Sequence, residues 1–180
     1  MKKRIETPRL ILRPFTMDDV EASYAMEQDP DVNRYTNDGG VKTLQQIEEV
    51  ISTGPLMDYE TYGFGRFAIE LKKDSKFIGF TGLKFMEDLG RVDLGYRLVK
   101  EHWGKGLATE SGVASLRFGF EELDFDEIVA TILPENLASA NVLSKLGFTL
   151  EEELTMYGVP QQLFSLQRAA WQTKQPPIHV

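Results

Sequence analysis

The chain of 180 residues contains no cysteine. It therefore has no disulfide framework, no thiolate metal site and no cysteine nucleophile. Histidine is almost as scarce: His102 and His179 are the only two, and neither belongs to a cluster of His, Asp and Glu with the spacing of a metal site. We therefore expect no bound metal. Because disulfides are rare in a reducing cytoplasm, their absence is compatible with the cytoplasmic localisation that we expect.

Long apolar runs and an excess of positive charge are also missing. No segment approaches the roughly 20 apolar residues that a membrane span needs, and the basic start of the chain is not followed by the apolar stretch of a signal peptide. Lys and Arg number 20 against 28 Asp and Glu, so the net charge is -8. We expect neither a membrane nor a nucleic acid as partner, because phosphate backbones require concentrated positive charge. A net negative charge is compatible with a cationic substrate such as a protonated amine. The same charge is also explained by its contribution to solubility alone.

The length suits a single domain with one core, and no internal repeat or linker interrupts the chain. We predict that this domain covers residues 1–172. Residues 173–180, which include Pro176 and Pro177, are predicted to form a loose tail.

Helix and strand signals alternate along the chain. Helical periodicity predicts helices over residues 16–28, 43–53, 106–122 and 137–146, the second of them ended by a Gly-Pro pair. β-prone runs predict strands over residues 9–13, 64–71, 77–85, 91–99, 127–133, 148–154 and 163–166. Short polar turns between residues 64 and 99 indicate an antiparallel meander. A helix then separates the strands at 91–99 and 127–133, which favours parallel pairing. The pattern predicts an α/β fold with a mixed, mostly antiparallel sheet.

Two glycines one residue apart stand between a predicted strand and a predicted helix. Gly104 and Gly106 let a ligand approach the backbone, where the first amides of the helix are unpaired and carry the positive end of its dipole. This position suits a pyrophosphate, and Lys105 adds a cation. The spacing excludes a P-loop, and Thr109 replaces the third glycine of a dinucleotide loop. A coenzyme A loop remains, as does a simple turn that begins a helix.

Five short motifs follow one another over residues 6–168. They are the segments 7–14, 29–32 and 94–96, the Trp-Gly-Lys-Gly run at 103–106 with Glu110, and Asn136 and Ser139 with Gly147 and Phe148. Each motif is weak alone, but together and in this order they resemble the GNAT superfamily of N-acetyltransferases. They are particularly similar to its RimJ/RimL-like branch, which acetylates protein N-termini such as those of ribosomal proteins.

The resemblance implies an acyl-CoA N-acyltransferase fold whose parallel strands splay apart, and acetyl-coenzyme A (acetyl-CoA) as co-substrate. Carried over residue by residue, it gives a cofactor-binding set of Tyr96, Arg97, Leu98, Trp103, Gly104, Lys105, Gly106, Leu107, Ala108, Thr109, Asn136 and Ser139. The family also uses a backbone amide, here that of Leu98, to polarise the thioester carbonyl. Packing for Trp103 and helix capping for Asn136 are the alternative readings.

Two positions depart from the family pattern. Glu101 stands where the family often has Gln or Arg, and it would weaken phosphate binding if it pointed inward. Ser144 replaces a Tyr that often donates a proton to the leaving thiolate. Ser139, Ser144 or water could supply that proton, or the thiolate could leave unassisted, since a thiol pKa near ~8.5 makes it a tolerable leaving group. Asp93 is a candidate base for the amine, or else a solvated or paired carboxylate.

The expected reaction is transfer of acetyl from acetyl-CoA to a primary amine by direct attack, because no cysteine is present to carry an acetyl-enzyme. An α-amine, with a pKa near ~7.7–8, loses its proton at neutral pH far more easily than a lysine-like amine near ~10.4. Since Asp93 is the only evident base, we expect a protein or peptide N-terminus as acceptor. A small-molecule amine (an antibiotic, polyamine or amino acid) and a non-catalytic CoA-binding protein are the alternatives. A monomer and a homodimer are both compatible with the sequence.

We expect the acceptor to enter from the side opposite the coenzyme. Its walls are predicted in residues 29–60 and 155–162, because loops on a rigid scaffold commonly carry specificity. The first segment contains Tyr35, Asn37 and Asp38, and the second contains Tyr157 and Gly158.

Overall fold

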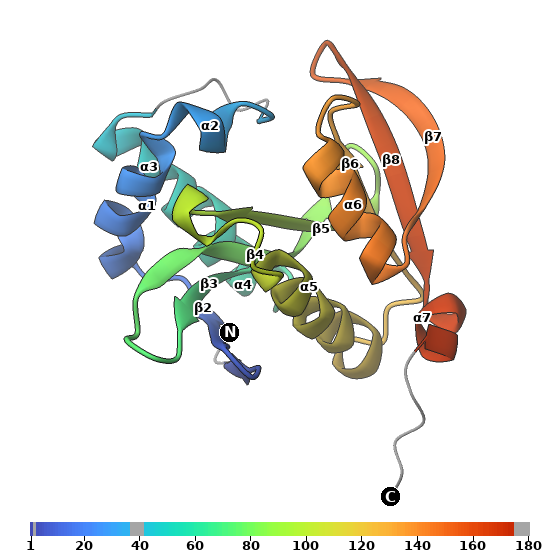
Figure 1. The fold of residues 1–180 in the computed structure, drawn as a ribbon, viewed down its shortest axis with the longest axis horizontal. Coiled ribbons are helices and arrows are strands. Elements are labelled where there is room, and N and C mark those ends of the chain that lie inside the picture. The colour runs from blue at the N-terminus through green and yellow to red at the C-terminus, as the bar shows by residue number, and fades with distance from the viewer. Residues whose placement is uncertain (2, 37–41, 175–180) are drawn as a thin grey trace, which may run out of the picture.

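The structure is a computed structural model that describes residues 1, 3–36 and 42–174. Within them, one sheet of eight strands has the order β1-β2-β3-β4-β5-β6-β8-β7 (Figure 1). The strands are β1 (Ile5–Glu6), β2 (Leu10–Pro14), β3 (Arg66–Leu71), β4 (Phe77–Met86), β5 (Arg91–Leu98), β6 (Glu127–Ile132), β7 (Thr149–Met156) and β8 (Val159–Gln167). The helices are α1 (Val20–Glu27), α2 (Pro30–Asn33), α3 (Leu44–Ile51), α4 (Met57–Thr61), α5 (Leu107–Arg117), α6 (Leu137–Leu146) and α7 (Arg168–Lys174). None of the helices in the described ranges is long and apolar enough to cross a membrane.

The sheet changes character at β5. This strand pairs antiparallel with β4 along its whole length, from Arg91 opposite Met86 to Leu98 opposite Gly79. It pairs parallel with β6 at a single position, where Asp93 lies opposite Val129. The two strands therefore diverge toward their carboxyl ends. The predicted mixed, mostly antiparallel sheet with one parallel pair is confirmed, and β5 runs between the half of the molecule with β1–β4 and the half with β6–β8 (Figure 1).

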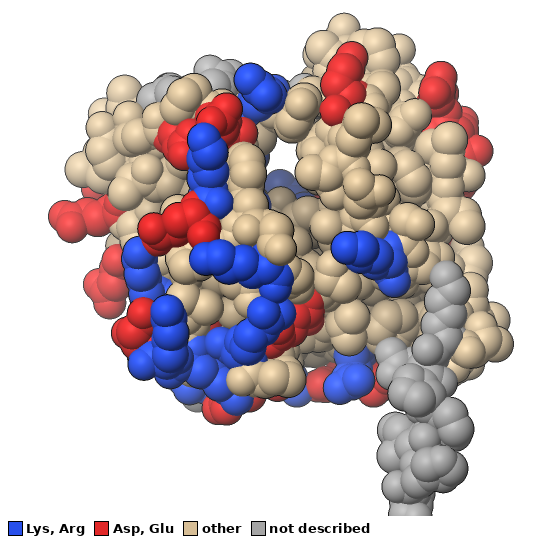
Figure 2. Space-filling model, in the orientation of Figure 1, with Lys and Arg blue, Asp and Glu red and all other residues tan. Residues whose placement is uncertain are grey.

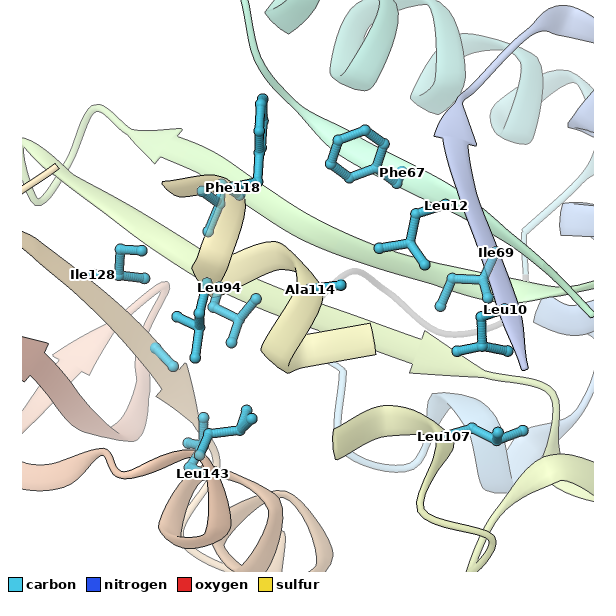
Figure 3. Close-up of a cluster of buried hydrophobic side chains, with 14 of the residues drawn as sticks. Leu10, Leu12, Phe67, Ile69, Leu94, Leu107, Ala114, Phe118, Ile128 and Leu143 are labelled. Carbon is cyan, nitrogen blue, oxygen red and sulfur yellow. The ribbon is translucent and has the colours of Figure 1, made fainter. Parts of the chain in front are cut away.

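Apolar clusters cover both faces of the sheet. On one face, α5 packs against the strands. The larger of the two apolar clusters lies there and includes Leu94, Leu107 and Ala114 (Figure 3). On the other face α1, α3 and α4 pack around Phe15 and Phe80. Burying these side chains from both directions fixes β5 as a central strand whose two faces contact different helices.

The residues of β5 divide between these two faces, because successive side chains of a strand point to opposite sides. Leu94, Tyr96 and Leu98 share the face of α5. Asp93 and Arg97 share the face of α1 and α3, where Arg97 lies over the Phe80 ring with its guanidinium carbon 5.6 Å from the ring centroid. A ligand held at the end of β5 can therefore be contacted from two different layers of the molecule.

One predicted boundary is confirmed and another is wrong. The Gly-Pro pair ends the helix of residues 43–53 as predicted, because the backbone of Gly54 is non-helical, with φ of -96° and ψ of -106°, and this kink separates α3 from the next helical segment, which contains α4. Proline at the start of a helical turn costs no internal hydrogen bond, so Pro55 is tolerated there. The predicted tail begins too early, since Thr173 and Lys174 belong to a helix, α7. Trp171 anchors α7, since it is 4% exposed and its ring lies 5.9 Å from that of Phe120. Pro176, Pro177 and His179 lie outside the described residues.

Candidate active site

The glycine-rich segment after β5 forms a tight turn into α5. Gly104 and Gly106 have φ angles of 70° and 74°, in the left-handed region that side-chain-bearing residues rarely adopt. Gly106 is the N-cap of α5, and its position leaves the first amides of the helix without intrahelical acceptors. Leu107 is buried in the core, whereas Lys105 is exposed. The turn therefore presents backbone N–H groups and one cation to solvent, as an anion site requires.

Glu110 links this turn to the start of the chain by hydrogen bonds. Its carboxylate accepts hydrogen bonds from the Thr7 hydroxyl at 2.6 Å, the Arg9 amide at 2.9 Å and Arg9 Nε at 2.6 Å. Arg9 Nη1 also donates to the carbonyl of Lys105 at 2.9 Å. Burial raises the pKa of Glu110, but the hydrogen bonds from Thr7 and Arg9 outweigh it, so this pKa lies below its ordinary value. The sequence did not predict these hydrogen bonds, although Glu110 and the segment 7–14 both belong to the motifs that resemble the GNAT superfamily.

The backbone of Leu98 faces the opening between β5 and β6. Hydrogen bonds alternate along an antiparallel pair, and Val99 N–H donates to the Ile78 carbonyl at 2.9 Å. The pair Leu98–Gly79 is therefore a non-hydrogen-bonded one, and the N–H and C=O of Leu98 point away from β4. Trp103 Nε1 donates to this carbonyl at 2.7 Å. The indole of Trp103 thus links the loop to the strand end, close to where the Leu98 amide is directed.

Tyr96 connects β5 to the N-terminus of α6 across the same opening. Its hydroxyl donates to the Ser139 carbonyl at 3.3 Å, and burial raises the pKa of Tyr96 to about 12, so the hydroxyl stays protonated at neutral pH. Asn136 is the N-cap of α6, where its side chain accepts from the Ser139 amide at 3.1 Å. Ser144 is exposed on the same helix, roughly 7.5 Å further along its axis than Ser139. Figure 2 shows the surface hollowed between the two halves of the molecule.

Asp93 lies where β5 and β6 begin to diverge. It is 5% exposed, and its Oδ2 accepts from Arg66 Nη2 at 2.6 Å. Its Oδ1 accepts from the Thr131 amide of β6 at 3.3 Å. The Arg66 guanidinium lies directly over Gly95, where an added Cβ would collide with Nη2. Asp93 therefore has the paired arrangement that was the alternative to a base, and it holds the two strands together at the root of the opening.

Glu101 is paired with Lys76 beside the glycine turn. Its carboxylate lies 2.5 Å from Lys76 Nζ and 3.1 Å from His102 Nε2, and the bond with Lys76 holds the pKa of Glu101 below its ordinary value. Glu101 lines a shallow pocket of about 230 Å³ together with Lys73, Lys76 and Lys105. Lys and Arg side chains also gather on this face of the molecule (Figure 2). The pocket also contains Asp74, so three lysines stand against two carboxylates beside the loop.

A second pocket, of about 380 Å³, lies on the opposite face of the sheet. Side chains from α1, α3, the kink at Gly54 and α4 form its walls, and Arg66, Phe80 and Lys84 lie at its floor. Arg97, whose side chain reaches this face from β5, forms an ion pair with Glu27 at the pocket wall. Part of the predicted acceptor segment 29–60 thus lines a real cavity.

The aromatic residues named for the acceptor walls lie elsewhere. Neither Tyr35 nor Tyr157 is among the residues that line the second pocket. Tyr157 is 66% exposed, and its hydroxyl donates to Asp88 Oδ2 at 3.1 Å. Asn37 and Asp38 lie outside the described residues. Sequence reasoning named none of the pocket's charged residues, because Glu27, Asp58, Arg66 and Lys84 come from four separate elements and form no motif.

Comparison with known proteins decides the family. The model of the acetyltransferase (GNAT) domain matches residues 9–149. This chain belongs to the GNAT acetyltransferase family. The uncharacterized N-acetyltransferase YoaA of Bacillus subtilis is 32% identical over 154 residues, which cover 85% of this chain and 86% of YoaA. The protein is thus an N-acetyltransferase of the GNAT family.

Solved structures share the GNAT fold over nearly the whole chain. The acetyltransferase from Agrobacterium tumefaciens superposes with a TM-score of 0.82 and 26% identity, covering 93% of this chain and 95% of that chain. RimL, the ribosomal L7/L12 alpha-N-protein acetyltransferase in complex with coenzyme A, superposes with a TM-score of 0.78 and 17% identity, covering 92% of this chain and 98% of that chain. The second likeness concerns the fold alone.

GNAT acetyltransferases use acetyl-CoA, and the residues present here suit it. The coenzyme contains a pyrophosphate, which matches a turn with unpaired helix amides and the cation of Lys105. It also contains a slender pantetheine arm, which matches an opening between β5 and β6 whose edge carries an outward-facing backbone amide. No group of His, Cys, Asp and Glu suited to a metal ion occurs in the described residues.

Proposed function

We propose that this enzyme transfers acetyl from acetyl-CoA to the α-amine of a protein or peptide N-terminus, as the RimJ/RimL-like branch does. The observation that carries the proposal is the placement of two sites on opposite faces of β5. The anion-binding turn precedes α5 on one face, and the cavity lined by Glu27 and Asp58 lies on the other. The end of β5 lies between them. Its position favours direct transfer, because a coenzyme and an amine could meet there without an acetyl-enzyme.

The hydrogen bonds of Asp93, the candidate base, support an α-amine. Both carboxylate oxygens of Asp93 already accept hydrogen bonds, from Arg66 and Thr131. An α-amine with a pKa near ~7.7–8 needs under roughly 1.4 kcal/mol to lose its proton at neutral pH, against about 4 kcal/mol for a lysine-like amine. An acceptor of the first kind therefore needs the least help from the protein. RimL, whose fold this chain shares, is a ribosomal L7/L12 alpha-N-protein acetyltransferase.

The residues of the opening would divide the work as follows. The turn at residues 103–109 and Lys105 would hold the pyrophosphate, and the edge of β5 from Tyr96 to Leu98 would align the pantetheine arm. Acetyl-CoA supplies the acetyl group as a thioester. The Leu98 amide, which points into the opening, would donate to the carbonyl oxygen as charge develops on it, an effect worth about 3–4 kcal/mol at other enzymes. Ser139, Ser144 or water would protonate the leaving thiolate.

Thiol release from acetyl-CoA, measured against a panel of amines, tests this proposal. The panel contains N-terminal tripeptides, the same tripeptides with a blocked α-amine and a free lysine, spermidine, and an aminoglycoside. We expect turnover with free α-amines and little with blocked peptides. Turnover confined to spermidine or the aminoglycoside would show a small-molecule acetyltransferase instead. Binding of coenzyme A without turnover of any amine would show a protein that has kept the fold and lost the reaction.

A further inference from the structure

The second pocket contains two carboxylates that are almost completely buried and incompletely bonded. Glu27 is 5% exposed and Asp58 is 8% exposed. Glu27 Oε2 and Asp58 Oδ2 have no hydrogen-bond partner among the described residues, and the Ser23 hydroxyl that lines the same pocket has none either. Buried polar atoms are nearly always hydrogen-bonded in native proteins. Three residues that line one cavity therefore each have a polar atom without a partner in the described structure, which points to a donor that enters from outside the chain.

The cations around the pocket do not supply that donor. Arg97 bonds the other oxygen of Glu27, and Arg66 bonds Asp93. Burial raises the pKa of Asp58, against the opposing charges of Lys84 and Arg66. No hydrogen bond joins Asp58 Oδ2 to Lys84 or Arg66 in the described structure. A primary ammonium carries three N–H donors and a positive charge, which is what two buried carboxylates and a hydroxyl lack.

The remaining walls restrict what can be attached to the ammonium. They are mostly apolar and come from Phe15, Met26, Ile47, Val50, Ile51 and Phe80. A volume of about 380 Å³ is near the lower end of the range of about 300–1,000 Å³ for small-molecule sites. The pocket is therefore suited to an apolar group of about one residue, and it is small for an aminoglycoside.

The pocket also lies next to the end of β5. Its floor residues Phe80 and Lys84 are the cross-strand neighbours of Arg97 and Asp93. Neighbouring strands are roughly 4.8 Å apart, so one strand separates this floor from the opening. Through Arg97, Glu27 is joined to the residue that precedes Leu98. An amine in the pocket would therefore be close to the strand end toward which the acetyl group is directed.

We propose that this pocket selects the acceptor: the N-terminal ammonium faces Glu27 and Asp58, and an apolar first side chain lies against α1 and α3. This inference rests on the proposed function, since it names the acceptor of that reaction. It adds two charged specificity residues and an apolar preference at the first position of the peptide.

Charge-removing substitutions test the ammonium site. Glu27→Gln and Asp58→Asn keep the shape of each side chain, and the amide oxygen introduced by Glu27→Gln can still accept from Arg97. We expect the KM for a tripeptide that begins with Leu to rise about tenfold to a hundredfold in each, because a hydrogen bond to a charged group is lost. The KM for acetyl-CoA should stay within about twofold. A thermal melt reports whether each variant is folded.

A matched pair on α3 tests the apolar wall. Val50 and Leu44 are exposed on the same helix, at 47% and 42%, but only Val50 lines the pocket. Val50→Asp should raise the KM for a Leu-initial tripeptide more than for a Gly-initial one, whereas Leu44→Asp should leave both unchanged. Equal effects of the two substitutions would contradict the assignment of this wall.

Binding without turnover separates this inference from the proposed function. The Leu-initial tripeptide, or leucinamide, is titrated by calorimetry into the enzyme saturated with coenzyme A, which has no acetyl group to transfer. Tight binding that weakens in Glu27→Gln supports the pocket. If the wild type acetylates tripeptides but Glu27→Gln and Asp58→Asn bind and react like wild type, the pocket proposal is overturned while the function stands. If no N-terminal peptide is acetylated, the function fails, and absence of Glu27-dependent leucinamide binding then overturns the pocket as well.

Discussion

The turn at residues 103–109 and the pocket beneath α1 and α3 lie on opposite faces of β5, yet they are built in different ways. The turn uses backbone amides that follow one another in the sequence, positioned by two glycines with positive φ. The pocket uses side chains from α1, α3, α4, β3 and β4. A site made of consecutive amides depends on local conformation, whereas a site made of converging side chains depends on how whole elements pack. If the two proposed roles hold, we expect the turn to tolerate few substitutions without loss of coenzyme binding, and the pocket to change its specificity one side chain at a time.

The largest effect is expected at Gly106, where the turn depends most on local conformation. A Gly106→Val substitution places a β-branched residue at a φ of 74°, which costs of order 1–3 kcal/mol, and it adds side-chain atoms where we propose that the phosphate binds. We expect binding of coenzyme A, measured by calorimetry, to weaken by about a hundredfold.

Gly90→Val is the matched control for that substitution. Gly90 has a φ of 62° in the β4–β5 turn, with no atom within 4 Å of an added Cβ, so it carries a similar backbone cost away from the site. The control should lower the melting temperature and leave coenzyme binding intact. Equal coenzyme affinity in Gly106→Val and wild type, with the fold retained, would remove the turn as the pyrophosphate site.

A smaller effect is expected from the serines of α6. Ser139 and Ser144 are each only a candidate proton donor, and Ser144 is exposed to solvent. Ser139→Ala or Ser144→Ala should lower kcat about tenfold to a hundredfold, the low end of general acid catalysis, with the KM for acetyl-CoA little changed. Near-complete loss of kcat in one variant, with coenzyme binding unchanged, would identify that serine as the dedicated acid.

The contrast between the two sites also explains what could be read from the sequence. Gly104 and Gly106 predicted a turn that begins a helix, and capping was one of the two readings of Asn136; the turn and the cap are both present. The parallel pair of β5 and β6 followed from a helix between two strands, which is again local order along the chain. Glu27 and Asp58 are 31 positions apart on different helices, and neither belongs to a motif. Their convergence depends on tertiary packing, which no periodicity reports.

The kink at Gly54 shows how far a local signal reaches. Gly-Pro ends the helix of residues 43–53 as predicted, because Gly54 is non-helical. The sequence did not indicate that a further helix, α4, begins after the kink. This helix brings Asp58 to the pocket that Glu27 also lines. The hydrogen bonds of Glu110 were not predicted because its partners Thr7 and Arg9 lie about a hundred residues away in the sequence.

A still smaller effect on catalysis is expected when the hydrogen bonds of Glu110 to Thr7 and Arg9 are weakened. Glu110→Gln weakens the bonds to Thr7 and Arg9, so the turn should bind acetyl-CoA with a KM several-fold to about tenfold higher, by loss of charge-assisted hydrogen bonds. Glu121→Gln is a control at the other end of this helical segment, because Glu121 pairs with Arg117 at the surface at 3.8 Å. It should leave the KM unchanged.

The same substitution makes a prediction for stability against pH. The pKa of Glu110 is lower in the folded protein than its ordinary value of about 4.3. A depressed carboxyl pKa stabilises the fold above the ordinary pKa, and this contribution is lost as pH falls through the folded pKa. The difference in stability between wild type and Glu110→Gln should therefore be constant near neutral pH and shrink below about pH 4. A gap that widens on acidification would contradict the bonding described for Glu110.

The smallest effect is expected on the pH profile of Asp93→Asn. The rate should rise with pH as the acceptor amine loses its proton, with an apparent pKa that tracks the amine. Both Asp93 oxygens accept hydrogen bonds, one from Arg66 and one from Thr131. The carboxylate therefore has a structural role, because it links β5 to β6. Replacing it with Asn leaves Arg66 without its ion-pair partner, so the melting temperature and the height of the profile should fall. The position of the rising limb should not move.

Repeating the profile with an acceptor of lower amine pKa should shift the limb in wild type and variant alike. A rising limb that is insensitive to the amine pKa in wild type and disappears in Asp93→Asn would make Asp93 the base.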